Sequence, residues 1–285
     1  MRIKHSQGDF KKEDLPKTRV DLFFDLLKVN TSVLFGMGAI IFLFSLPFLI
    51  VSFICDYSLA TIFVNITNSE IGDEEIALMI SSTISFYDLI KIPCYIVLGI
   101  GASGIMQVIR RLVWGEGVML SQDFFDGIKS NALTYSICFL VFGLINYLDG
   151  FIFRRLGGSN FFAYAPLIVS VVFLLPIGLF ILSQSIIYSN RFHKYVYNGF
   201  ILYFKSFFRT LIASIVFFVI LSVGLISDLI IKYILLTVFF FAIIPILMTI
   251  WFLYSCFVFD KYINKENHPD IYGKGLYLKK YEKDK

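Results

Sequence analysis

The residues that could do chemistry in this 285-residue chain are few and are scattered along it. Its three histidines, His5, His193 and His268, all lie in polar segments, and its four cysteines form neither a CxxC pair nor a Cys/His spacing suited to zinc. Glycine-rich phosphate loops, catalytic serine motifs and paired carboxylates do not occur. The sequence therefore predicts a protein that is not an enzyme and that uses no metal or cofactor.

Polar side chains within the apolar stretches are the next place where chemistry could occur. No Asp, Glu, Lys or Arg lies deep in such a stretch, although transporters driven by protons or ions usually carry one there. Gln107, Asn146 and Gln184 are the candidate intramembrane polar contacts, and a structural role in hydrogen bonds between helices is favoured for Asn146 and Gln184. Cys55 and Cys94 are expected near the same face, where a disulfide is an open alternative to two free thiols.

The composition predicts the elements that position these residues. A mean hydropathy of +0.78 and a hydrophobic content of 58% are typical of a membrane protein. The apolar stretches predict an all-α polytopic membrane protein with six transmembrane helices. Their approximate ranges are 33–54, 91–107, 132–148, 161–187, 211–225 and 233–259. Residues 56–88 carry six acids and no Lys or Arg, and we expect a loop there with one short helix at 76–87.

An eight-residue phrase, FFD-x-x-K-x-N, occurs at residues 23–30 and 124–131, and a degraded copy occurs at 200–205. Each copy precedes an apolar stretch, and its split of polar and aromatic residues is typical of an amphipathic helix on the membrane surface. We expect Ser121 to cap the second of these helices. The pattern predicts a single membrane domain, 21–261, built from three tandem parallel repeats. The repeat units are 21–111, 122–191 and 197–261, and residues 1–20 and 262–285 are expected to be tails, the second of them mobile.

The return helix of each unit has features that could shape its packing. It carries a proline, Pro93, Pro176 or Pro245, and the return helix of the first unit also carries three glycines, Gly99, Gly101 and Gly104. Small residues let a neighbouring helix approach closely.

Charge predicts the orientation. All but four of the 25 Lys and Arg residues lie on the side that holds both tails and the repeated phrases. The exceptions are Lys91, Arg154, Arg155 and Lys232. The positive-inside rule therefore predicts a multi-pass plasma-membrane protein with both termini in the cytoplasm.

The polar residues of the repeated phrases and their basic neighbours form the candidate site on the cytoplasmic side. They admit two interpretations, contact with lipid headgroups or a docking face for a membrane-protein partner. A nucleic-acid partner is not expected, because these cations flank membrane spans. The candidates are Lys28, Asn30, Arg110, Arg111, Lys129, Asn131, Lys205 and Arg209.

A set of motifs in residues 21–225 resembles the YesL-like family of membrane proteins, which are bacterial and mostly from Gram-positive species. The matching residues are Asn30, Leu46-Pro47, Gly101-Ala102-Ser103-Gly104, Arg110-Arg111, Glu116, Asp123-Phe124-Phe125, Lys129 and Asn131. The chain departs from the family in the acidic segment 56–88 and in its longer C-terminal tail. Members of the family accompany carbohydrate uptake and degradation systems, so the resemblance implies an accessory role with a sugar ABC transporter. It defines no functional residues. The residues themselves leave open a permease or channel for a small neutral solute.

Overall fold

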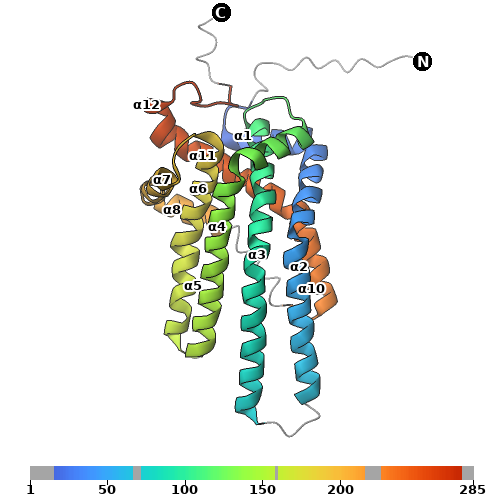
Figure 1. Ribbon diagram of the computed structural model, residues 1–285. Coiled ribbons are helices and arrows are strands. Elements are labelled where there is room, and N and C mark those ends of the chain that lie inside the picture. The colour runs from blue at the N-terminus through green and yellow to red at the C-terminus, as the bar shows by residue number, and fades with distance from the viewer. Residues whose placement is uncertain (1–15, 67–71, 158–159, 216–225, 278–285) are drawn as a thin grey trace, which may run out of the picture.

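The computed structural model describes residues 16–66, 72–157, 160–215 and 226–277, and every regular element in these ranges is helical (Figure 1). The all-α prediction is therefore confirmed. Within the described residues, five helical runs are long and apolar enough to cross a membrane. They are Thr31–Ile66, Glu74–Val113, Leu120–Leu156, Phe161–Ile187 and Leu229–Asn267.

The first two long helices extend further than the sequence predicted. After α1 (Arg19–Val29), α2 runs from Thr31 to Ile66 and α3 from Asp73 to Val113. The loop predicted at 56–88 is therefore wrong, because only a few residues around 67–72 separate the two helices. Charged side chains mark where a helix leaves an apolar layer, but they do not end a helix in water, and acids in the first turn of α3 favour its N-terminus. We call residues 56–66 and 73–88 the stalk.

Ion pairs gather where the stalk begins. Asp56 accepts hydrogen bonds from Lys232 Nζ at 2.6 Å and from Tyr233 Oη at 2.9 Å. Asp88 pairs with Arg154 at 3.0 Å and with Lys91 at 3.1 Å. Three of the four cations that the sequence assigned to the outer side are thus neutralised by stalk carboxylates. Cys55 and Cys94 lie next to this level as free, buried thiols.

The third long helix, α4, is continuous from Leu120 to Leu156. The prediction of a separate surface helix at 122–131 is therefore wrong, although Figure 1 shows the start of α4 inclined across the end of the bundle. Ser121 is exposed and does not cap the helix, because α4 already begins at Leu120. The N-cap residue is Met119, whose N–H donates to the Asp123 carboxylate at 2.9 Å. The helix ends where Gly157 adopts a positive φ of 77°.

The return path is a chain of helical segments that matches the range 161–187 predicted for the fourth span. It then turns at residues 188–191 into a helix that lies beside α6. The segments are η2 (Phe161–Tyr164), α5 (Ala165–Val169), the π-helical η3 (Ser170–Leu174), α6 (Leu175–Ile187) and α7 (Phe192–Lys205).

The last part of the chain crosses the bundle obliquely (Figure 1). It begins with α8 (Phe207–Ile215). The fifth predicted span, 211–225, lies largely outside the described residues. The sixth corresponds to α10 (Leu229–Val238), π-helical η5 (Phe239–Ile243), α11 (Ile244–Phe259), π-helical η6 (Asp260–Asn264) and α12 (Lys265–Asn267).

Contacts of α8 and the end of α7 with α11 and η6 show that α8 runs antiparallel to α11. Tyr262 Oη donates to the Lys205 carbonyl at 3.1 Å, and Thr210 Oγ1 lies 2.8 Å from Tyr254 Oη. The residue numbers rise on one helix as they fall on the other. α8 thus runs antiparallel to the last span.

Two of the four return-span prolines follow a π-helical segment at the same offset. Pro176 comes two residues after η3 and Pro245 two residues after η5. Proline has no N–H to donate to the carbonyl four residues earlier, which frees Val172 and Phe241 respectively. Tyr203 Oη of α7 donates to the Val172 carbonyl at 2.6 Å, and the Phe241 carbonyl faces Gly38 of α2. Each proline therefore provides a backbone contact between helices.

Replacing Tyr203 by phenylalanine tests the first of these contacts. Tyr203 is fully buried, and Tyr203→Phe keeps the ring but leaves the Val172 carbonyl without this donor, so we expect a loss of about 1–3 kcal/mol in stability. Thermal unfolding in detergent micelles measures the loss. Tyr197→Phe on the same helix, where the side chain is 67% exposed, is the matched control and should change little. Equal effects of the two changes would contradict the assignment.

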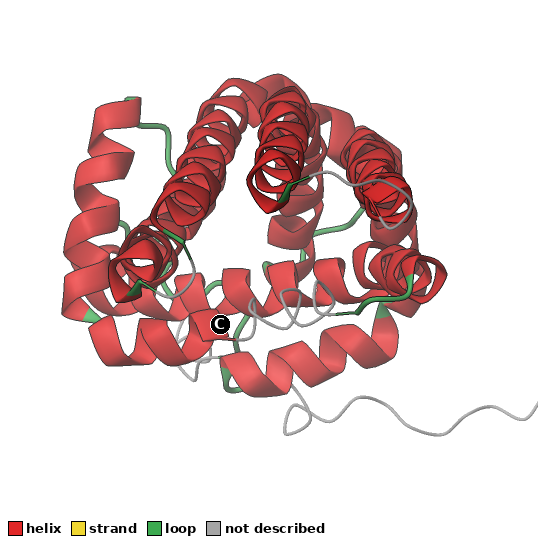
Figure 2. Cartoon of the chain, turned by 90° about the horizontal axis from the view of Figure 1, so that it is seen from below, coloured by secondary structure: helices red, strands yellow, loops and turns green. Residues whose placement is uncertain are grey.

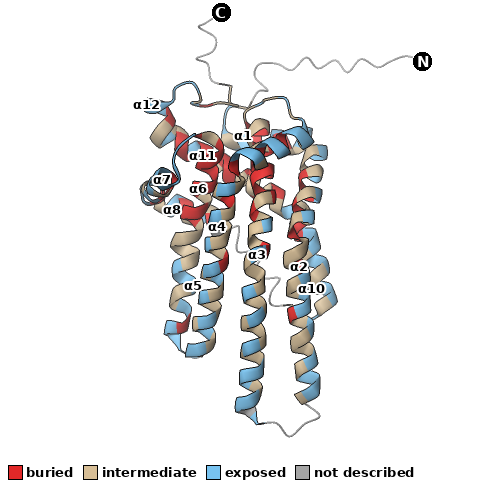
Figure 3. Cartoon of the chain, in the orientation of Figure 1, coloured by how far each residue is buried: buried red, intermediate tan, exposed pale blue. Residues whose placement is uncertain are grey.

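Buried residues gather near the end of the molecule that carries α1 and α7, whereas the opposite half has mostly exposed or half-buried side chains (Figure 3). We call the end that carries α1 and α7 the terminal end, because the first and last described residues meet there: Tyr277 N–H donates to the Pro16 carbonyl at 2.9 Å. Viewed along the long helices, the bundle forms an arc with shorter helices lying across it (Figure 2). The tight packing thus lies where the candidate residues are.

Candidate functional site

The first copy of the repeated phrase forms α1 at the terminal end. Thr18 caps the helix and forms a capping box with Asp21, and Leu22 and Leu26 are buried against the bundle. Phe24 is 64% exposed on the other face. The helix breaks at Asn30, whose carbonyl accepts the Leu34 N–H of α2. This is the lead-in helix followed by an elbow that the sequence predicted.

The third copy has the same design in α7. Tyr203 is fully buried, whereas the adjacent Phe204 is 62% exposed. The helix ends at Lys205, and a one-residue break at Ser206 precedes α8. Here the Leu202 carbonyl accepts both the Ser206 hydroxyl at 2.6 Å and the Ser206 N–H at 3.1 Å.

The second copy keeps the side-chain arrangement but not the elbow. Phe124 is buried and Phe125 is 65% exposed, nearly the same fraction as Phe24. A Cβ added at Gly104 of α3 would collide with the Phe124 ring, and one at Gly127 would meet Gly104. This close approach confirms the packing role predicted for Gly104. The helix α4 continues without a break past Asn131, which is buried.

The elbow lysines remain separate in the structure. Lys28, Lys129 and Lys205 are all exposed, and no contact between described residues joins any two of them. Lys205 Nζ lies 5.6 Å from the Tyr262 ring and the Arg209 guanidinium lies 5.9 Å from the Phe257 ring, so both cations rest on aromatic residues of the last span. Nothing in this arrangement encloses a vestibule among the described residues.

Arg110 and Arg111 have different surroundings. The Arg110 guanidinium stacks over Trp114 at 4.8 Å and donates to the Ile186 carbonyl at 3.4 Å. Arg111 pairs at 2.9 Å with the fully buried carboxylate of Asp123. Arg111 thus ties the end of α3 to the start of α4, a structural role that the sequence did not predict because Asp123 fell in the helix 122–131 expected on the membrane surface.

The three intramembrane polar candidates also have different surroundings. Gln184 is fully buried and its amide donates to the carbonyls of Phe180 and of Tyr195 in α7. Gln107 lies at the crossing of α3 and α4 beside Gly127, without a hydrogen bond to another described residue. Asn146 is exposed and likewise has no such bond, so the cross-helix contact expected of it is not present among the described residues.

A second polar cluster in the core was not expected. Ser183 Oγ accepts from Trp251 Nε1 and from Ser255 Oγ, each at 3.1 Å, which links α6 to α11. All three residues are buried. Serine and tryptophan in apolar stretches give no sequence signal for such a network, because their partners are distant in the chain.

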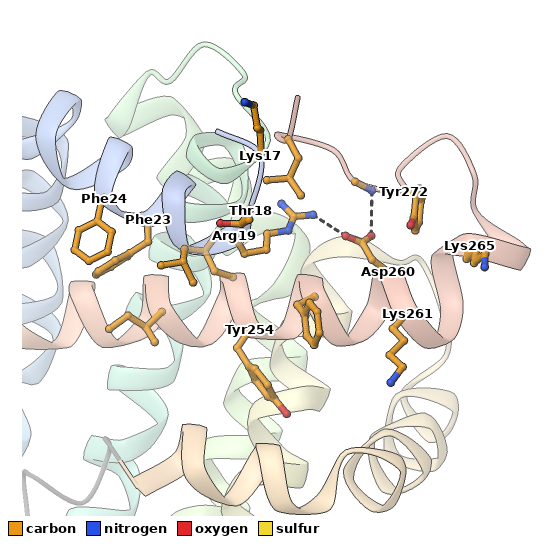
Figure 4. A pocket seen from close by; sticks show the side chains of 16 residues that line it. Lys17, Thr18, Arg19, Phe23, Phe24, Tyr254, Asp260, Lys261, Lys265 and Tyr272 are labelled. Carbon is orange, nitrogen blue, oxygen red and sulfur yellow. Dashed lines mark hydrogen bonds and ion pairs between the residues drawn. The ribbon is translucent and has the colours of Figure 1, made fainter. Parts of the chain in front are cut away.

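The C-terminal segment is the largest feature that the sequence did not reveal. Residues 265–277 were expected to be a mobile tail, but the described residues pack on the bundle through Asp260. This carboxylate accepts from Arg19 Nη2 at 2.7 Å, from Asn264 Nδ2 at 2.8 Å and from Gly273 N at 3.3 Å (Figure 4). Gly275 completes the packing with a φ of 86° and no room for a Cβ beside the Val113 carbonyl.

Further contacts of Lys274 hold this segment, and Tyr188 holds Asn264 just before it. Lys274 pairs with Glu116 at 2.8 Å and lies 4.1 Å from the Trp114 ring. Tyr188 Oη donates to Asn264 at 2.6 Å, and burial raises the pKa of this phenol, so it stays a donor. The sequence signal that could have predicted this structure is a lone acid at the end of an apolar span, Asp260, followed by Gly273 and Gly275.

The chain was compared with models of protein families, with curated proteins and with solved structures, and none of the three comparisons found a match.

Proposed function

We propose that this is an accessory membrane protein of carbohydrate uptake, which binds a transporter component through its terminal end and does not itself move a solute. The resemblance to the YesL-like family suggests the transporter, such as a sugar ABC transporter. The described structure provides the surface that would bind this transporter component. Exposed aromatic residues and cations stand side by side there, on α1, the start of α4 and α7.

The proposal includes six spans in three repeats, with both termini in the cytoplasm. Two observations support the repeats: the first and third copies of the phrase both form a helix followed by a one-residue break, and Pro176 and Pro245 both follow a π-helical segment. The orientation rests on charge, because all but four of the 25 Lys and Arg residues belong to the segments on the side of the terminal end.

One observation favours the accessory role over a permease. A path for a neutral solute would need polar side chains facing a continuous cavity at mid-depth. Gln184 instead donates to two backbone carbonyls in a core packed by Phe180, Trp251 and Phe259, and Asn146 faces away from the bundle. Neither residue lines either of the two main cavities among the described residues.

Co-purification tests the partner. We expect a transporter membrane subunit to purify in mild detergent with the tagged chain, and to be reduced by at least about tenfold when Lys28, Lys129 and Lys205 are changed to Glu, since like charges at an interface are repulsive. Arg155→Glu, at the far end of α4, gives a control with the same change in net charge as each single Lys→Glu variant. Failure of any transporter component to co-purify with the unchanged chain contradicts the proposal.

Reconstitution of the protein into liposomes distinguishes the accessory role from the alternative function, a permease. The accessory role predicts that liposomes containing the purified chain take up a neutral sugar or glycerol no faster than empty liposomes. Uptake that depends on Gln184 would instead establish a permease.

A further inference from the structure

A groove of about 1030 Å³ lies at the terminal end, between α1, the end of α11 and the C-terminal segment (Figure 4). It is separate from the elbow residues considered above. Its walls come from elements that the sequence placed in two different tails and in the last span. The Arg19–Asp260 ion pair joins these walls, with both side chains at most 15% exposed.

The groove has an apolar floor. Val20 and Phe24 of α1 line it and are each 64% exposed, and Phe257 of α11 lines it with 42% exposed. Leu253 and Ile250 continue the floor along α11. Large apolar side chains left uncovered in this way need an apolar occupant, because water contact with them is unfavourable.

The rim of the groove is cationic. Lys17, Lys261 and Lys265 line it, all three are exposed, and none pairs with a carboxylate of a described residue. The one acid that lines the groove, Asp260, is neutralised by Arg19. Lys261 also lies 5.0 Å from the Tyr262 ring, where its ammonium stays near the edge of the membrane-spanning helix.

We infer that the groove binds one anionic glycerophospholipid, with its acyl chains on the apolar floor and its phosphate among the three rim lysines. Charge disfavours the nearest competitors. The adjoining terminal segments, 1–15 and 278–285, are both net basic, and a second copy of the chain would present the same cationic rim. An anionic amphiphile alone matches both the floor and the rim. The inference does not depend on the proposed transporter partner.

Native mass spectrometry of the full-length protein from detergent micelles can measure the bound lipid. With equal amounts of phosphatidylglycerol and phosphatidylcholine, we expect about tenfold preferential retention of phosphatidylglycerol. The double variant Lys261→Gln/Lys265→Gln should reduce this preference to about threefold or less. Lys129→Gln/Lys194→Gln removes the same charge from exposed positions outside the groove and should leave the preference unchanged.

A second pair of variants tests the apolar floor. Val20→Trp should fill the groove and reduce retention of phosphatidylglycerol by at least about fivefold, whereas Val29→Trp, at a site on the same helix that is 63% exposed and outside the groove, should not. The proposal is overturned if the control lysines act as strongly as the rim lysines, which would mean diffuse charge. It is also overturned if Val20→Trp has no effect, if retention rises on deleting residues 1–15 or 278–285, or if the groove instead mediates dimers.

Discussion

Gly38→Ala is expected to destabilise the protein by about 3 kcal/mol, although alanine is the better helix former. Gly38 is a buried residue of α2, and a Cβ there would overlap the carbonyl oxygen of Phe241. That carbonyl belongs to η5 and cannot rotate away as a side chain could. The change would therefore push α2 away from the π-helical segment, and unfolding in a denaturing detergent measures the cost.

Gly117→Ala is the matched control, because nothing lies within 4 Å of a Cβ at Gly117. The same chemical change should alter stability there by less than about 0.5 kcal/mol. Equal stabilities of the two variants would mean that α2 and η5 are not in backbone contact.

Arg111→Met should cost about 3–5 kcal/mol, because it leaves the carboxylate of Asp123 buried without its cation. Asp123 is fully buried and would keep only the hydrogen bond from Met119 N–H. The loss should appear as a lower unfolding temperature and as looser packing between the end of α3 and the start of α4.

A double-mutant cycle separates the ion pair from the rest of the contact. Asp123→Asn in the Arg111→Met background removes the unpaired charge and retains an acceptor for Met119 N–H, so it should recover most of the lost stability. Arg155→Met, at an exposed arginine without a carboxylate partner among the described residues, should be nearly neutral. A double variant no more stable than Arg111→Met would contradict the pairing.

The sequence predicted helices well where amphipathicity and hydropathy act locally. The helix at 161–187 and the lead-in helices of the first and third copies follow from these patterns. The second copy shows the limit. It has the same phrase as the first, yet its chain stays helical past Asn131, and α4 packs closely on α3 at Gly104 and Gly127. Gly104 lies outside the phrase and Gly127 occupies one of its variable positions, so the shared pattern contains neither glycine.

The predictions for the helix ends and for the C-terminal segment were wrong for related reasons. Hydropathy reports where a helix leaves an apolar layer, so it placed a loop where α2 and α3 continue as the stalk. Polar composition likewise suggested a tail after the last span. The contacts of Asp260 with Arg19 and Gly273 involve residues from both ends of the chain, which no local pattern contains.

The sequence predicted one candidate site made of basic and other polar residues. The structure places these residues in different surroundings. Arg111 is used to join two helices and Arg110 stacks on Trp114, whereas Lys28 and Lys129 remain exposed at the surface. Residue type alone could not make this division, because a buried and an exposed cation look alike in a sequence.

The stalk also sets a height above the bilayer. At 1.5 Å per residue, the 36 residues of α2 measure about 54 Å and the 41 of α3 about 61 Å, against a hydrocarbon core of about 30 Å. At least about 20 Å of each helix must therefore stand clear of the acyl chains, and the hydrogen bond between Ser58 and Tyr87 links the two there. Removing one heptad from both helices would shorten this projection by about 10 Å while nearly preserving the direction of each face. Anything that meets the far end of the stalk does so at a spacing fixed by the helical rise.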